Sequence, residues 1–304
     1  MVPDAVASIS VVIPTLDRAQ VLLETIEALL GLADPPDELL VVDQSVRHTE
    51  AVQTRLLELD RSGRIRWIRR ERPSIPAAMN AGLLAATGEF ALFLDDDIEP
   101  RGELIAAHRA ALETRAGSLV AGQVLQPGED PEPLEGAGFR FRSSLAQAVS
   151  EFMGGNFSVP RERAIGIGGF DEKFVGAAYR FESDFALRWT SGGGEIAFEP
   201  SASIRHLRAG TGGTRSWGHH LRTIRPSHAV GEYYFLLRHR PPGTVRRIFS
   251  RFLHSVTTRH HLRRPWWIPL TLFAELWGFL WAVGLALGAP RFLGGRVAIA
   301  EGAP

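Results

Sequence analysis

The feature that most constrains the fold is a unit repeated four times between residues 9 and 115, in which a short apolar run precedes a segment with helical spacing. Such runs predict strands, and apolar side chains three and four residues apart predict helices. Parallel strands need crossover connections that cover both faces of a sheet, so the repeat predicts an α/β fold with a mostly parallel sheet and helices on both faces. The expected strands are residues 9–13, 39–42, 65–68 and 90–94, and the expected helices are residues 18–30, 49–59, 77–86 and 102–115.

The regular alternation weakens after Val124. Residues 126–138 are rich in proline, glycine and acids, which predicts a loop. Residues 153–209 are expected to mix short strands, a glycine-rich turn and one helix around residues 183–190.

Composition sets the size of the core and excludes some chemistry. The chain has 304 residues and is 45% hydrophobic, which allows one large domain or two ordinary ones. It has no cysteine, which excludes disulfides, thiolate metal sites and a cysteine nucleophile. Residues 1–8 do not join a basic stretch to an apolar one, so the sequence shows no signal peptide and we expect the catalytic part in the cytoplasm.

Charge is distributed unevenly along a chain whose formal net charge is zero. The neutral total gives no general reason to expect a nucleic-acid partner. Between Arg205 and Arg264, however, the chain has 13 arginines, eight histidines and a single acid, Glu232. A segment this basic suits the phosphate groups of a substrate or an anionic membrane surface.

Residues 266–289 form a third kind of segment, with four tryptophans and a single charge, Glu275. Their number is sufficient to cross a bilayer. Pro269, Glu275 and three glycines nevertheless favour a helix lying on an anionic leaflet at the inner face of the cell membrane, with a true span and a buried or oligomerising helix as alternatives. We therefore expect a catalytic domain over residues 1–215 and a basic, membrane-associating helical region over residues 216–304.

Three polar turns follow predicted strands: residues 14–17, 43–45 and 95–97. The carboxyl ends of parallel strands lie at one edge of a sheet, where ligands bind, so these turns should converge there. Within the triplet Asp95-Asp96-Asp97, alternate residues of an extended segment point the same way, so Asp95 and Asp97 can share a direction that Asp96 does not. A solvated turn or helix start explains the triplet on its own, and a divalent cation site is the alternative.

Five motifs, in order, decide between these interpretations because together they resemble the inverting family 2 glycosyltransferases, which have the Rossmann-type GT-A fold. The likeness runs from about residue 9 to about residue 215. The motifs are VVIPTLDR at residues 11–18, LLVVDQS at 39–45, IPAAMNAGLLAATGEFALFLDDD at 75–97, FMGGNFSVPRERAIGIGGFDEKF at 152–174 and YRFESDFALRW at 179–189.

The resemblance implies a hexosyltransferase-type enzyme that uses a nucleoside diphosphate sugar, Mn²⁺ or Mg²⁺, and a glycan or lipid-linked hydroxyl acceptor of the cell envelope. Asp97 would ligate the cation, and Asp95 would approach the ribose or a metal-bound water. His206 would reach the metal or the diphosphate. The other residues expected around the nucleotide are Pro14, Thr15, Asp17, Asp43 at the base, Asn80, Asp96, and Arg215 beside glycines 210, 212 and 213. Asp96 is the acid of the triplet expected to tolerate replacement best.

An inverting transfer needs a base for the attacking hydroxyl. Counting back from Arg188, the family pattern places Glu182 at the usual base and Asp184 at a later acid, while Phe181 replaces the first acid. Glu182 is the favoured base, and Asp184 remains the alternative.

Two departures from the family pattern and two rival functions remain. Gln44 follows Asp43 where glycine is common, and Met79 precedes Asn80 where arginine is common. An aspartate-nucleophile phosphatase also carries two alternate aspartates after a strand, but it places them on its opening strand. A non-catalytic module that binds sugar nucleotides or polysaccharide would bind a donor without transferring its sugar.

Overall fold

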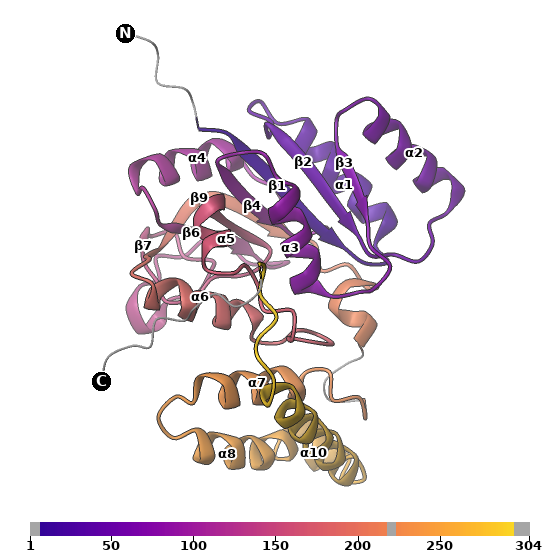
Figure 1. The fold of residues 1–304 in the computed structure, drawn as a ribbon, viewed down its shortest axis with the longest axis vertical. Helices are drawn as coiled ribbons and strands as arrows, with labels where there is room; N and C mark the ends of the chain where they lie inside the picture. The colour runs from indigo at the N-terminus through magenta and orange to yellow at the C-terminus, as the bar shows by residue number, and fades with distance from the viewer. Residues whose placement is uncertain (1–6, 218–222, 295–304) are drawn as a thin grey trace.

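The structure, a computed structural model, describes residues 7–217 and 223–294. Its described residues form one nine-stranded sheet with the strand order β3-β2-β1-β4-β8-β6-β9-β5, and β7 pairs with β9 (Figure 1). The strands are β1 Ile9–Thr15, β2 Glu38–Asp43, β3 Arg66–Arg69, β4 Phe90–Leu94, β5 Ile98–Pro100, β6 Leu119–Leu125, β7 Gln147–Ala148, β8 Asn156–Pro160 and β9 Ile196–His206.

The four predicted strand and helix pairs are confirmed. Strands β1 to β4 are parallel neighbours, and each is followed in the chain by a helix, although the short strand β5 separates β4 from α4. Thr49 and Ser74 cap α2 and α3 because their side chains accept hydrogen bonds from the backbone N–H groups of Val52 and Ala77. The helices of the sheet domain are α1 Ala19–Leu30, α2 Glu50–Arg61, α3 Ile75–Ala85, α4 Leu104–Thr114, α5 Arg161–Gly166 and α6 Phe181–Ser191, with short 3₁₀ helices at Gly136–Gly138 and Gly213–Trp217.

The second half of the sheet is mixed rather than parallel. Strand β8 runs antiparallel to both of its neighbours, β4 and β6, while β6 and β9 run parallel to each other. Two successive reversals give β6 and β9 the same direction as β4. The carboxyl ends of β1, β2, β4 and β9 therefore lie at one edge, where the amino end of β8 also lies.

Both faces of the sheet are covered, and alternate residues of each strand enter different cores. Val11 and Ile13 of β1 belong to the core cluster that includes residues of α1, α2 and α4, whereas Val12 between them belongs to the cluster that includes residues of α3, α6 and α7. All three are fully buried. Two apolar faces per strand explain why these strands are continuous apolar runs.

The C-terminal part is a layer of helices beside the sheet domain (Figure 1). Tyr233 and Tyr234 nevertheless belong to the same core cluster as the strands, so this layer shares a core with the sheet domain. After the last helix the chain returns to the sheet domain, where Leu293 N–H donates to the carbonyl of Gly168. The division at residue 215 remains a proposal about function. The helices of this layer are α7 Ala229–His239, α8 Thr244–Val256, α9 Arg259–Arg263 and α10 Trp267–Ala286.

Candidate active site

A cavity of about 250 Å³ opens at the edge where the strand ends meet. Pro14 and Thr15 come from the end of β1, Asp95 follows β4, and His206 ends β9. Helix α6 contributes Glu182 to the same wall. The predicted convergence of polar turns on one crevice thus holds for the turns after β1, β2 and β4, because Gln44 after β2 also lines the cavity.

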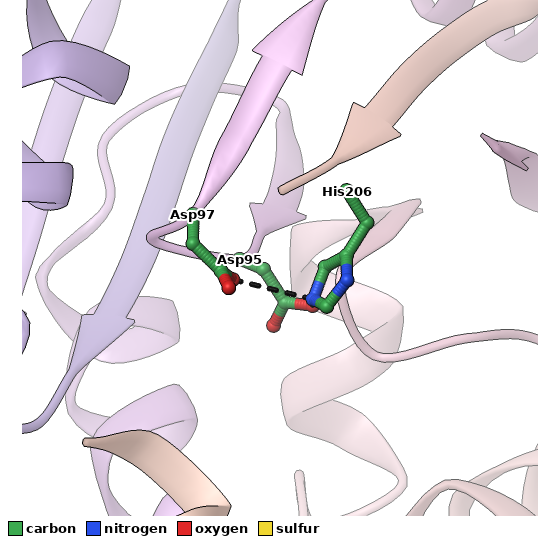
Figure 2. A group of neighbouring side chains, drawn as sticks. All are labelled: Asp95, Asp97 and His206. Carbon is green, nitrogen blue, oxygen red and sulfur yellow. Dashed lines mark ion pairs between the residues drawn. The ribbon is translucent and has the colours of Figure 1, made fainter. Parts of the chain in front are cut away.

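Asp95, Asp97 and His206 bring their side chains together at this edge (Figure 2). The Nε2 atom of His206 lies 3.2 Å from Oδ1 of Asp97 and 3.6 Å from Oδ2 of Asp95. One ligand atom from each residue lies within 4.8 Å of the other two. Two carboxylates and one imidazole at these distances form a candidate divalent metal centre.

The surroundings of Asp97 are a second observation that fits a metal ion. Oδ2 of Asp97 accepts a hydrogen bond from the Ala209 N–H at 2.8 Å, whereas the buried Oδ1 makes no hydrogen bond of good geometry among the described residues and has Nη1 of Arg18 at 2.8 Å and Nε2 of His206 at 3.2 Å. A buried carboxylate oxygen is stabilised by positive charge, so Oδ1 is a suitable ligand atom for a cation. The Asp97 side chain is fully buried and the Asp95 side chain is 46% exposed, so a bound ion would contact the cavity through Asp95.

The charged side chains of this cluster shift one another's pKa values. Desolvation, together with the carboxylates of Asp96 and Asp97, raises the pKa of Asp95 to about 6. The approach of Asp97 raises the pKa of His206 above its ordinary value. A protonated His206 thus compensates part of the negative charge of these acids, and a bound divalent cation would do the same.

Asp96 has a structural position that the sequence did not indicate. It is buried, accepts a hydrogen bond of 2.6 Å from the Thr15 hydroxyl, and pairs with Nη1 of Arg18 at 2.7 Å. The same Arg18 atom lies 2.8 Å from Oδ1 of Asp97. The expectation that Asp96 tolerates replacement best stays a prediction, and these contacts argue against it, because losing Asp96 would leave the buried Thr15 hydroxyl without its partner and remove one of the two carboxylates beside Arg18. Arg18 ends the motif VVIPTLDR, but nothing in the sequence indicated its contacts with Asp96 and Asp97.

Glu182 lies in the cavity wall at the start of α6. Its Oε1 accepts a hydrogen bond of 3.0 Å from the Gly154 N–H. Desolvation, reinforced by the negative charge of Asp95, raises its pKa to about 7. A carboxylate with a pKa near neutrality, placed in a cavity, is poised to accept a proton.

Gly154 and Gly155 hold the two sides of the site together, and sequence reasoning assigned them no individual role. A Cβ on Gly155 would lie 2.1 Å from Oδ2 of Asp95, and one on Gly154 would lie 2.9 Å from Oε1 of Glu182. The Gly155 carbonyl also accepts a hydrogen bond from the Asp95 N–H. Paired glycines directly before an apolar strand are the sequence signal for such a close backbone approach.

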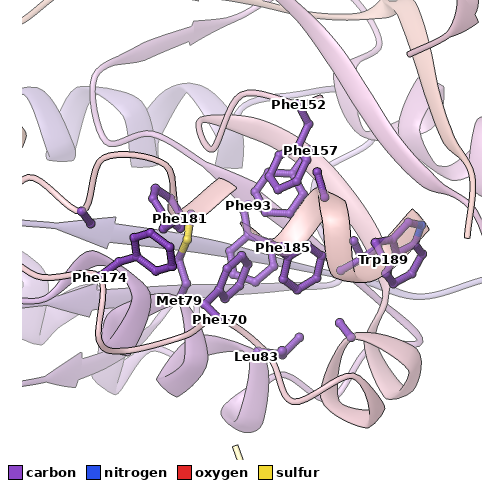
Figure 3. Packing of buried hydrophobic residues seen from close by; sticks show 14 of the residues in the cluster. Met79, Leu83, Phe93, Phe152, Phe157, Phe170, Phe174, Phe181, Phe185 and Trp189 are labelled. Atoms are coloured by element: carbon purple, nitrogen blue, oxygen red, sulfur yellow. The ribbon is translucent and has the colours of Figure 1, made fainter. Parts of the chain in front are cut away.

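An aromatic core packs α6 against the sheet (Figure 3). Phe185 stacks on Phe170 with ring centroids 4.5 Å apart, and Phe93 of β4 stacks on Phe157 at 4.9 Å. The edge of Phe170 meets Phe93 at 5.5 Å and so links the two pairs. Because β4 leads into the aspartates and α6 carries Glu182, this packing sets the position of the metal centre relative to the carboxylate.

Asp184, the alternative base, lies in a different environment from Glu182. It is 1% exposed and accepts hydrogen bonds from Arg188 at 2.8 and 2.9 Å and from His239 at 2.7 Å. Burial alone would raise its pKa, but Arg188 and His239 outweigh burial and lower it. Asp184 thus anchors α6 to α7, and the described residues that line the cavity do not include it.

The structure places three other predicted nucleotide residues away from the cavity wall that its described residues form. Asp43 is buried and accepts hydrogen bonds from the Trp67 indole and the Ser45 N–H, and His48 lies 2.5 Å from it. Asn80 is also buried and bridges α3 to the Phe170 backbone. Asp17 is exposed, and the side chain of Arg215 lies outside the described residues.

Chemically, this arrangement combines a cation site and a base site in one cavity. Oxygen and nitrogen ligands stand on the β4 and β9 side, and a carboxylate with a raised pKa stands on the α6 side. A cation, if held by Asp95 and Asp97, would neutralise negative charge on a bound group, and Glu182 is placed to accept a proton from another.

Comparisons with known proteins agree with this arrangement. A sequence model described as "Glycosyl transferase family 2" matches residues 10–184. The "Uncharacterized protein y4gI" of Sinorhizobium fredii (strain NBRC 101917 / NGR234) is 26% identical over an alignment of 229 residues, and the match covers 67% of this chain and 25% of that protein. The chain thus spans a quarter of the length of this curated relative.

Two solved structures share the fold. GalNAc-T7 with UDP, GalNAc and Mn²⁺ has a TM-score of 0.55 at 15% identity, over 77% of this chain and 51% of that chain. The mannosyltransferase PcManGT of Pyrobaculum calidifontis, in complex with GDP-Man and Mn²⁺, has a TM-score of 0.53 at 22% identity, over 94% of this chain and 81% of that chain. The latter coverage includes helices of the C-terminal layer as well as the sheet.

Proposed function

The chain belongs to glycosyl transferase family 2, and from that premise we propose that it transfers a hexose from a nucleoside diphosphate sugar to a hydroxyl acceptor with inversion. The observation that carries this proposal is the shared cavity, whose wall includes Asp95 and His206 of the cluster together with Glu182, while Asp97 lies buried behind them. An inverting transfer needs a cation near the leaving diphosphate and a base near the attacking hydroxyl.

A divalent cation, Mn²⁺ or Mg²⁺, would be held by Asp97, Asp95 and His206. Such an ion neutralises charge that develops on the departing diphosphate. The imidazole in the donor set is compatible with Mn²⁺, which accepts nitrogen ligands more readily than Mg²⁺ does. Mn²⁺ also accompanies the nucleotide or nucleotide sugar in both solved structures of the same fold, which supports a nucleotide-sugar donor here.

The other proposed roles, those of the base, the cavity wall and the residues that support it, fall to separate groups of residues. Glu182 accepts the proton of the acceptor hydroxyl, and its raised pKa increases its basicity. Pro14, Thr15 and Gln44 form the wall on the nucleotide side. Arg18 holds Asp96 and lies against Asp97, which keeps the loop after β4 in place. Asp43 and Asn80 would act by supporting the walls, because their side chains are occupied by protein partners.

We further propose that the helical layer rests on the anionic inner face of the cell membrane, where the acceptor would be an envelope glycan or glycolipid. Helix α10 is long and apolar enough to cross a bilayer by length and composition. Its single charge, Glu275, faces inward and accepts hydrogen bonds from Tyr233 and Arg251. The outer apolar face comprises the exposed residues Val245, Phe249, Leu253, Leu262, Trp266, Phe273, Leu276, Trp277 and Leu280.

Contacts of α10 favour lying on the membrane over spanning it. Ala282 belongs to the main core cluster, and Gly278 packs closely on Ala229 of α7. A helix fixed sideways to a sheet domain does not cross a bilayer without breaking these contacts. Exposed arginines at 259, 263 and 264 suit an interfacial helix on anionic lipid.

Donor binding and turnover test the proposed reaction. A thermal-shift screen of nucleoside diphosphate sugars with Mn²⁺ should give one stabilising donor, because a ligand that binds the folded state stabilises it by mass action. With that donor, Asp97→Asn should lose the Mn²⁺-dependent shift and about 10³-fold or more of the turnover, the scale expected for removing metal or oxyanion stabilisation. Asp130→Asn, on a loop outside the cavity, is the matched control. Donor binding without transfer to any acceptor would instead indicate a sugar-nucleotide-binding module.

A further inference from the structure

A second cavity, of about 500 Å³, lies between α7, α8 and α10. Tyr179 and Arg180, directly before α6, form part of its wall. The next two residues, Phe181 and Glu182, line the candidate active site. A segment of four consecutive residues thus separates the two cavities.

The lining of this second cavity carries an excess of positive charge. Arg180 pairs with Glu232 at 2.8 Å, and Arg251 pairs with Glu275 at 2.9 Å. Arg225 and Arg247 also line it, and neither forms an ion pair with an acid in residues 7–217 and 223–294. Four arginines against two glutamates leave two guanidinium groups to meet an anion.

Hydroxyl groups also line the cavity: Ser250 and Ser255 of α8, Thr258 before α9, Thr271 of α10 and Thr223 before α7. Several of them bond within the protein, among them Ser255 to the Phe252 carbonyl and Thr258 and Thr271 to the His261 ring. The guanidinium groups are therefore the main donors for phosphate oxygens, and hydrogen bonds between ionised partners are about twice as strong as neutral ones. The chemistry of the lining therefore matches a phosphate or diphosphate group.

The position of the cavity indicates where that phosphate comes from. Arg247 and Arg251 share α8 with Val245, Phe249 and Leu253, which are each 67% exposed and belong to the outer apolar face. One helix thus presents cations to the cavity and apolar side chains to the outside. A lipid phosphate combines both features, since its chain lies in apolar surroundings and its headgroup is anionic.

We propose that this cavity binds the phosphate of a lipid-linked acceptor and so delivers the hydroxyl of that acceptor to Glu182. The inference rests on the proposed glycosyl transfer and names the class of its acceptor. The Cα atoms of Arg180 and Glu182 are at most about 7.6 Å apart, twice the spacing of neighbouring Cα atoms. Arg180 has a left-handed φ of 73°, which is uncommon for a residue other than glycine, and its guanidinium is held by Glu232 in the cavity wall.

Titration calorimetry with farnesyl phosphate on the full chain tests this site. EDTA is present, so that the cluster at Asp97 has no cation with which to hold a phosphate. Arg247→Gln should weaken binding about tenfold, the loss of roughly 1.4 kcal/mol expected for one charged contact. Arg246→Gln is the matched control, because it removes the same exposed charge from the neighbouring position outside the cavity lining. The double variant Arg225→Gln with Arg247→Gln should bind more weakly than either single variant.

The outcomes separate this inference from its alternatives. Equal weakening by Arg246→Gln and Arg247→Gln would mean general surface attraction and would overturn the site. Binding of inorganic phosphate as tight as that of farnesyl phosphate would overturn the lipid source, and equally tight binding of farnesol would overturn the phosphate. The donor thermal shift with Mn²⁺, measured on the same protein preparations without EDTA, reports separately on the proposed transfer: if it persists while farnesyl phosphate does not bind, only the inference about the acceptor fails.

Discussion

At the sheet edge, three consecutive aspartates and Glu182 meet two cationic side chains, whereas the cavity in the helical layer is lined by four arginines and two glutamates. The first region has an excess of negative charge, and the second has an excess of positive charge. In the chain as a whole these charges cancel. Each region therefore has uncompensated charge that a ligand of opposite charge would balance, a cation at the sheet edge and a phosphate in the helical layer.

The two regions also differ in how their charges are held. Asp97 is fully buried beneath the strand ends, while Arg247 is exposed on α8. Rigid burial suits a site that must hold reacting groups in fixed positions, and exposed arginines suit a surface that meets a mobile lipid. We therefore expect substitutions at the sheet edge to change turnover and substitutions in the helical layer to change recruitment.

The largest effect is expected from Glu182→Gln. Removing a general base costs about 10² to 10⁴ in rate, and Oε1 of glutamine still accepts the Gly154 hydrogen bond, so the fold should survive. In the wild type, kcat/KM should rise with pH through about 7 as Glu182 loses its proton, with a bound cation moving this limb somewhat lower. The variant should lack that limb. If Asp184→Asn removed the limb and Glu182→Gln kept it, the assignment of the base would be reversed.

The same substitution has an opposite effect on stability. The pKa of Glu182 is raised from 4.5 to about 7 on folding, so the folded state binds more protons than the unfolded state between these values. The stability that protonated Glu182 contributes is therefore fully present below pH 4.5, falls as pH rises through this window, and is lost above it. Glu182→Gln should lack this contribution, while the fall caused by Asp95, whose pKa is also raised, remains in both proteins. The Tm of the variant relative to that of the wild type should therefore grow from pH 4.5 to about pH 7.

How much of this site the sequence predicts depends on the kind of contact. Strand β4 has the predicted bounds because five apolar residues between polar turns leave one interpretation. The grouping of Asp95 and Asp97 follows from alternation along an extended segment, and the addition of His206 follows from motif order. The environments of Asp96 and Asp43 could not be predicted, because their partners Arg18 and Trp67 come from other elements and depend on how the chain packs.

The mixed half of the sheet was less predictable for a related reason. Strands β6, β8 and β9 are not separated by regular helices, so no repeat marks their direction. The environment of Asp184 was equally hidden, since two acids at one helix start look alike in sequence. Only the packing of α6 on α7 brings His239 into hydrogen-bond contact with Asp184 and leaves Glu182 in the cavity wall.

An intermediate effect is expected from Gly155→Ala. The new Cβ would lie 2.1 Å from the Asp95 carboxylate, so that side chain must move and the metal ligands with it. We expect a loss of about 10 to 100-fold in turnover, the scale of a misplacement of about 1 Å at a reacting centre. Gly138→Ala is the matched control, because nothing lies within 4 Å of its added Cβ. Titration of Mn²⁺ should show weaker binding only for Gly155→Ala; unchanged Mn²⁺ affinity would argue that Asp95 is not a ligand.

The smallest effect on turnover is expected from Leu253→Ser in the outer apolar face. This residue is 67% exposed on α8, and the matched control Leu84→Ser replaces a leucine that is 53% exposed on α3 of the sheet domain. With a soluble acceptor both variants should match the wild type, because neither side chain lines the candidate active site. With vesicles containing anionic lipid, Leu253→Ser should reduce the partition coefficient between vesicles and water about tenfold, since a leucine that enters the interface contributes roughly 1.5 kcal/mol. Sedimentation of protein with vesicles measures this. Equal losses of vesicle binding for both variants would mean that binding is not specific to the helical layer. No loss for Leu253→Ser would contradict the proposal that this layer contacts the membrane.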